Sequence, residues 1–167
     1  SSFASCAKLT SVTIPAGVAS IGDYAFNNCA GLSSITVDDA NSYYASEDGV
    51  LFDKNRSVLM QYPQAKIGTV YTIPNTVSSI GQSAFSYAAN LSSIVIPDSV
   101  TNIAISAFFY CSNLTDITIP SGVTSIEAGT FYTCIKLTSI VILENVTSID
   151  DSAFNNFSAL TIYGKAN

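Results

Sequence analysis

The feature that most constrains the fold is a 23-residue unit that recurs along the chain. Each copy has a leucine, an alternating stretch of the form Leu-x-x-Ile-x-Ile, usually a proline, and further on a phenylalanine. The leucine and the phenylalanine each recur every 23 residues within two groups of copies. They are Leu9, Leu32, Leu91, Leu114, Leu137 and Leu160, and Phe3, Phe26, Phe85, Phe108, Phe131 and Phe154. A fixed period of roughly 20 to 29 residues predicts a solenoid in which each copy forms one turn.

One copy shows how a turn is expected to form. Val12 and Ile14 alternate with serine and threonine, which predicts a short strand with one buried face. Pro15 ends this strand, because proline has no N–H for the ladder. The apolar spacings around Phe26 predict one short helical turn on the outer side, with the ring in the core. We therefore expect an α/β repeat solenoid, with a parallel β-sheet on one face and short helical or irregular turns on the other.

One copy is longer than the rest. The interval from Val37 to Ile73 exceeds the regular 23-residue period, so residues 38–70 form an enlarged turn. This turn lacks a recognisable phenylalanine element and instead carries two apolar runs, at 50–52 and 58–60, on either side of a polar stretch. That pattern predicts a β-hairpin, which we expect to lean out of the stack. Inserts of this kind often lie on the binding face of repeat proteins.

The repeats resemble the BspA-like leucine-rich repeats, the treponemal-type subclass. The resemblance rests on copies such as residues 114–126, which read LTDITIPSGVTSI and are followed by Phe131 and Cys134. It implies that residues 1–167 form one leucine-rich-repeat domain, a right-handed coil with an N-terminal half-repeat and a truncated C-terminal repeat. It also implies a cell-surface or secreted protein, mostly from bacteria, that has no catalytic residues and engages other proteins or host surfaces.

Composition argues against several functions. The net charge is −6 and the chain has only six lysines and arginines, whereas nucleic-acid binding needs clustered basic residues. No apolar run approaches the roughly 18 residues of a membrane span, so no membrane insertion is expected. There is no histidine, which removes Ser-His-Asp and Cys-His catalysis, and there is no glycine-rich phosphate loop. We expect a protein that is not an enzyme and has no cofactor.

The cysteines leave two alternatives open. Cys6, Cys29, Cys111 and Cys134 share one repeat position, which other copies fill with alanine or phenylalanine. An apolar position of this kind suits a buried thiol that packs as a small hydrophobic side chain. A disulfide between neighbouring turns, such as Cys111–Cys134, is the alternative.

Acidic residues are candidates for metal binding or catalysis. The loop 38–48 has enough oxygen atoms for calcium but lacks the order of an EF-hand, so a solvated turn is the alternative. The pairs Asp38–Asp39 and Asp150–Asp151 are adjacent in sequence, so their side chains are expected to diverge. A helix cap at Asp150 or Asp151 is favoured over a catalytic pair.

Aromatic residues indicate a first candidate binding surface. Just after the core phenylalanine, the middle copies carry aromatic residues where other copies have small polar ones. These residues are Tyr87, Phe109, Tyr110 and Tyr132, and Tyr43, Tyr44 and Tyr62 around the insert are further candidates. A contiguous aromatic patch would mark a contact surface, and the alternative is that the rings cover the ends of the turns.

The outward strand positions form a second candidate surface. They are Ser11, Thr13, Ser34, Thr36, Thr72, Ser93, Asp116, Thr118 and Ser139. Nearly uniform serine and threonine suit cross-strand pairing, which favours a structural role, with broad, weak binding as the alternative. The function we expect is adhesion, through binding to protein or glycan on another cell or in the extracellular matrix. A purely structural spacer that presents other domains is the alternative.

Overall fold

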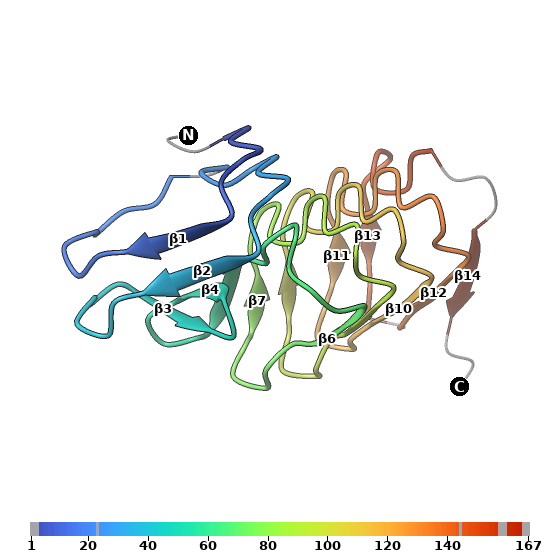
Figure 1. The fold of residues 1–167 in the computed structure, drawn as a ribbon. Coiled ribbons are helices and arrows are strands. Elements are labelled where there is room, and N and C mark those ends of the chain that lie inside the picture. The colour runs from blue at the N-terminus through green and yellow to red at the C-terminus, as the bar shows by residue number, and fades with distance from the viewer. Residues whose placement is uncertain (1–3, 23, 144, 157–159, 165–167) are drawn as a thin grey trace.

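The computed structural model describes residues 4–22, 24–143, 145–156 and 160–164. These residues form a coil that runs from β1 and β2 at one end to β14 at the other (Figure 1). They contain fourteen strands and no helix. Phe3, the phenylalanine of the N-terminal half-repeat, lies outside the described residues. The chain is therefore a β-solenoid, and the α/β class expected from the repeat is corrected.

The larger parallel sheet forms one face of the coil. Its order is β14-β12-β10-β8-β6. The strands are β6 (Val70–Thr72), β8 (Ser93–Val95), β10 (Asp116–Ile119), β12 (Ser139–Ile142) and β14 (Thr161–Gly164). Neighbouring strands pair residues that lie one repeat apart, as Asp116 does with Ser139. Ile94, Ile117 and Ile140 are buried beneath this sheet, as the alternation predicts.

A second face carries very short strands. They are β7 (Ser79–Ile80), β9 (Asn102–Ile103), β11 (Ser125–Ile126) and β13 (Ser148–Ile149). β7 pairs with β9 and β11 with β13, in both cases in parallel. β7, β9 and β11 each mark the point after a proline turn where an isoleucine returns toward the core, whereas Ile149 of β13 is exposed. A single inward residue gives no alternation, so the sequence pattern does not predict these strands.

The third face was expected to carry short helical or irregular turns, and the described residues form irregular turns there and no helix. Backbone φ is positive two positions before and two positions after the core phenylalanine, as at Ser106 (+57°) and Tyr110 (+58°) around Phe108. The N–H groups of these three residues donate to backbone carbonyls of the next turn, as Phe108 does to Thr130 over 2.9 Å. A helix needs the same N–H groups for bonds within its own turn. Hydrogen bonding between turns therefore replaces the helix.

The enlarged turn forms three strands that belong to the stack. β3 (Tyr44–Glu47) and β4 (Val50–Asp53) are antiparallel, and the turn between them has positive φ at Asp48 and Gly49, as a type I′ turn requires. β4 also pairs in antiparallel fashion with β5 (Val58–Gln61), which pairs in parallel with β7. The insert continues the second sheet in the order β3-β4-β5-β7-β9 and does not lean out.

The insert divides the stack into two parts. β1 (Ser11–Ile14) and β2 (Ser34–Val37) form a separate parallel sheet, on the left in Figure 1. The free edge of β2 is covered by the hairpin, because the N–H of Ile35 donates to the carbonyl of Gly49 over 2.8 Å. The buried residues likewise fall into two clusters, a small one around Ile35 and a large one beneath the later turns. We call residues 4–37 the first block and residues 58–164 the second block.

A column of stacked rings runs through the second block. Its members are Tyr62, Phe85, Phe108, Phe131 and Phe154, with centroids 5.3 to 5.5 Å apart. Tyr62 lies one repeat period before Phe85 and is 1% exposed. The enlarged turn therefore does contain the phenylalanine position, filled by tyrosine. Tyr62 belongs to the core, which corrects its place among the surface candidates.

The cysteines are thiols, and all four lie in the described part of the chain. The thiols of Cys111 and Cys134 donate to the carbonyls of Phe85 and Phe108, with sulfur–oxygen distances of 3.2 and 3.1 Å. Burial raises the pKa of the Cys111 thiol well above its ordinary value. Cys6, near the start of the coil, is exposed. The shared repeat position thus holds a small hydrophobic side chain in the turns where it is buried.

Candidate functional site

Four aromatic side chains from three consecutive turns contact one another on the third face of the coil, which we call the turn face. We call Tyr87, Phe109, Tyr110 and Tyr132 the aromatic cluster. Tyr87 stacks on Tyr110 with centroids 5.2 Å apart, and Phe109 stacks on Tyr132 at 5.1 Å. Tyr87 also meets Phe109 edge to face at 5.7 Å. Tyr110 is 38% exposed and the other three are half-buried, so the cluster combines mutual packing with an accessible surface.

The backbone explains why these rings stack. Tyr87 and Tyr110 occupy the second position after the core phenylalanine, where φ is +62° and +58°. Asn28 and Asn156 fill the same position in other turns, and asparagine is among the residues that tolerate this conformation best. Tyrosine tolerates this conformation less well. The two tyrosines gain ring stacking instead, because equivalent residues of adjacent turns lie next to each other in the stack.

The tyrosines around the insert do not join this cluster. Tyr44 is 9% exposed, packs in the smaller core, and accepts a hydrogen bond from the N–H of Ile21 over 2.9 Å. It holds the hairpin against the first block, which corrects its place as a surface candidate. Tyr43 is 55% exposed on the same hairpin. These two neighbouring residues thus have opposite environments, with Tyr44 in the core and Tyr43 in solvent.

The outward strand positions are split between two sheets. Ser11 pairs with Ser34, and Thr13 with Thr36, in the sheet of the first block. In the second block, Asp116 pairs with both Ser93 and Ser139. Thr72 and Thr118 lie in the same sheet, each opposite a valine. The insert separates the two sheets, so these residues do not form one continuous face.

Several oxygen atoms of the acidic loop accept hydrogen bonds within the protein. The side-chain oxygen of the buried Asn41 accepts the N–H groups of Tyr43 and Tyr44 over 2.8 and 2.9 Å. The ammonium group of Lys54 donates to the carbonyls of Asp39 and Asn41. Within the described ranges, no three acidic or cysteine side chains gather as metal ligands would. The loop therefore carries no assembled metal site.

Asp150, one member of the second carboxylate pair, caps a turn. One carboxylate oxygen of Asp150 accepts the N–H of Ser152 over 2.9 Å and its hydroxyl over 2.6 Å. These hydrogen bonds lower the pKa of the Asp150 carboxyl. The capped segment is a turn and not the helix that was expected.

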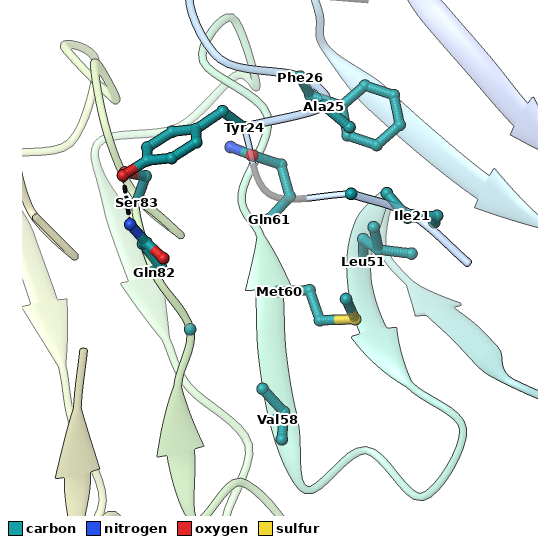
Figure 2. Close-up of a pocket in the computed structure, with 12 residues that line it drawn as sticks. Ile21, Tyr24, Ala25, Phe26, Leu51, Val58, Met60, Gln61, Gln82 and Ser83 are labelled. Carbon is teal, nitrogen blue, oxygen red and sulfur yellow. Dashed lines mark hydrogen bonds between the residues drawn. The ribbon is translucent and has the colours of Figure 1, made fainter. Parts of the chain in front are cut away.

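A groove lies between the first block and the second, and the repeat pattern of the sequence does not predict it. Three hollows that share lining residues follow one another between residues 21–30 and residues 81–90. The first has a volume of about 230 Å³ and is apolar on the side of Leu51 and Met60 (Figure 2). The amide of Gln82 donates across it to the hydroxyl of Tyr24 (Figure 2). We call the three hollows together the junction groove, and the irregular length of one copy was its only signal in the sequence.

Known proteins share both the repeat and the fold. The BspA type leucine rich repeat region matches residues 1–49 and 64–166 in six copies. A leucine rich cell surface protein from Faecalibacterium prausnitzii is 34% identical, with a TM-score of 0.75 over 95% of this chain and 48% of that protein. A leucine-rich repeat protein from Eubacterium ventriosum is 25% identical, with a TM-score of 0.64 over 91% of this chain and 60% of its own. The pneumococcal vaccine antigen PcpA, at 18% identity and a TM-score of 0.57 over 94% of this chain and 51% of its own, shares the fold.

The chain spans about half the length of the Faecalibacterium protein. No curated protein matches it. The described residues include no helix long and apolar enough to cross a membrane. The match to the repeat covers most of the sequence, on both sides of the insert. The chain therefore belongs to the BspA-type leucine-rich repeat family.

Proposed function

We propose that this repeat domain is a non-enzymatic adhesion module of a bacterial cell-surface or secreted protein. It binds protein or glycan on another cell or in the extracellular matrix, and the aromatic cluster is its contact surface. The description of the Faecalibacterium neighbour as a cell surface protein supports the location. Leucine-rich repeats generally act through protein interactions, which supports the class of function.

The observation that carries the proposal is the mutual stacking of the cluster. Tyr87, Phe109, Tyr110 and Tyr132 contact one another at centroid distances of 5.0 to 6.3 Å, and three successive turns hold them in place. Aromatic side chains with fixed rotamers are favoured anchors at interfaces, because they bury a large area at a small cost in entropy. The cluster thus presents a preorganised surface.

The chain itself supplies the matched substitution for a test. Phe109 and Tyr110 correspond to Asn27–Asn28 and to Asn155–Asn156 in other turns, so the double change to asparagine keeps a pair of residues that this backbone accepts. We expect the double variant to lose at least about tenfold in binding to an array of extracellular-matrix proteins and glycans. Its far-ultraviolet circular dichroism should stay that of the wild type.

The control for this test is Tyr43→Asn, which removes an exposed ring away from the cluster. Unchanged binding by the double variant would refute the contact surface. Loss of the folded signal in the double variant would show that the rings serve the core instead.

A spacer function has its own support. The hydroxyls of Ser33, Ser92 and Thr115 each donate to a backbone carbonyl of the preceding turn, over 2.9 to 3.1 Å. Such bonds stiffen the stack without offering a ligand site. A spacer predicts no binding anywhere on the same array, whereas an adhesion module predicts at least one saturable partner.

A further inference from the structure

One hollow of the junction groove is lined by Gln64, the last residue of a buried segment. Residues 61–64 are all buried, although the equivalent segments of other turns reach the surface. Gln64 lines this hollow together with residues 28–30 on one side and residues 87–90 on the other. Two of the three hollows lie on either side of Tyr87, with volumes of about 390 and 240 Å³. Together they reach the size of a small-molecule site.

Two buried polar atoms in this region have no hydrogen-bond partner within the protein. They are Nε2 of Gln64 and Oδ1 of Asn27, and no other buried side-chain nitrogen or oxygen of the described residues shares this property. Gln64 is 6% exposed and lines the larger hollow, and Asn27 lines the smaller one. One atom can only donate and the other can only accept. Buried polar groups are nearly always paired, so each of these atoms is expected to bond to a partner that the protein itself does not supply.

The lining of both hollows is uncharged. It consists of amide, hydroxyl, alanine and aromatic side chains, with no lysine, arginine, aspartate or glutamate. An anionic or cationic ligand would therefore be desolvated without a counter-charge. Tyr87 borders both hollows, and its ring is fixed by Tyr110 and Phe109. A rigid ring between amide groups matches a pyranose, which has an apolar C–H face and hydroxyls that both donate and accept.

An extended peptide fits this groove less well. Strand addition needs a row of unpaired backbone groups along the wall. The N–H groups of Ser83 and Tyr87 already donate to the carbonyls of Ile105 and Phe109 in the next turn, over 3.1 and 2.8 Å. The groove therefore offers mainly side-chain hydrogen bonds.

We infer that the junction groove binds a neutral oligosaccharide. Tyr87 provides the platform for one sugar ring, Gln64 donates to a sugar oxygen, and Asn27 accepts from a hydroxyl. The inference rests on the proposed function, because Tyr87 also belongs to the aromatic cluster, and it narrows the ligand to a chemical class.

Isothermal titration of the whole chain with trisaccharides tests the inference. The neutral probes are maltotriose, mannotriose, cellotriose and chitotriose, and the charged probes are 3′-sialyllactose and trigalacturonate. We expect at least one neutral probe to bind and neither charged probe to do so. Gln64→Leu removes the donor at similar volume, so binding should weaken at least about tenfold. Asn27→Ala, a change at a half-buried site, should weaken the binding of the same probe. It serves as the second variant.

The matched control is Tyr43→Asn, which removes an exposed ring that belongs neither to the aromatic cluster nor to the lining of the groove. Saccharide binding should survive this change. Binding that is lost when Tyr132→Asn removes a ring of the aromatic cluster, but kept in Gln64→Leu, would overturn the inference and leave the proposed function standing, because the sugar would then lie on the cluster. Failure of every neutral probe, or equal binding of a charged one, would also overturn it.

Discussion

Replacing Phe108 by alanine interrupts the ring column at its centre. Phe108 is fully buried, and its centroid lies 5.3 Å from those of both Phe85 and Phe131. Truncation of a buried phenylalanine costs about 3–5 kcal/mol, through lost transfer free energy and the remaining cavity. Two ring contacts disappear together, each contributing about 0.5–1.5 kcal/mol beyond burial, which places the expected loss near the upper end. A domain has a total free energy of unfolding of about 5–15 kcal/mol, so Phe108→Ala removes a large part of the stability.

Phe154→Ala is the matched control, because it makes the same chemical change at a half-buried position in the last described turn of the column. We expect it to cost about half as much as Phe108→Ala, since the transfer and cavity contributions fall with burial. Urea unfolding followed by circular dichroism and tyrosine fluorescence measures both losses, and the chain has no tryptophan to obscure the second signal. Equal losses in the two variants, or a loss below about 1.5 kcal/mol for Phe108→Ala, would refute a column stabilised through neighbouring turns.

Three further predictions concern buried polar and ionisable groups. Asn41→Ala removes an amide that makes hydrogen bonds of 2.8 to 3.0 Å to four backbone groups, so the free energy of unfolding should fall by about 3 kcal/mol or more in urea titrations; a loss under about 1 kcal/mol would contradict this. Burial raises the pKa of Tyr62 to about 12 from 10.0, so its contribution to stability is full below pH 10 and is lost as the pH rises toward 12. Unfolding curves at pH 9 to 12 should show this decline, and Tyr62→Phe should reduce it. Iodoacetamide at pH 8 should modify the exposed Cys6 rapidly and the buried Cys111 only after unfolding, as mass spectrometry of the digested protein would reveal; rapid labelling of both would refute it.

The period and the alternation predict the larger sheet well. A 23-residue interval gives the register between strands, as with Asp116 and Ser139, and the alternating isoleucines predict which face is buried. Both signals repeat in every regular copy, so agreement between copies reinforces each one. The enlarged turn is harder to predict from the sequence, because Tyr62 occupies the position that phenylalanine fills in other copies. Its distance of one period from Phe85 is the signal that identifies this position.

The turn face could not be predicted, because its conformation is not carried by one residue type. The two positions with positive φ hold residues as different as Ser106, Tyr110 and Thr133. Glycine or asparagine would signal this backbone, but among the described turns only Gly129, Asn28 and Asn156 are of these types. The hydrogen bonds between turns impose the conformation on whatever residue is present, which is a property of the stack and not of the local sequence.

The candidate sites arise where the repeat departs from its own regularity. Regular turns satisfy their backbone groups with their neighbours and fill the core with equivalent residues, which leaves little for a ligand to contact. The insert separates two turns that would otherwise stack, and the groove between them retains a buried donor at Gln64 and an acceptor at Asn27. An unpaired buried donor destabilises a fold by about 1–3 kcal/mol, so a stack selected for stability alone would favour an apolar residue at Gln64. The polar groups of the groove therefore fit a binding function better than a structural one.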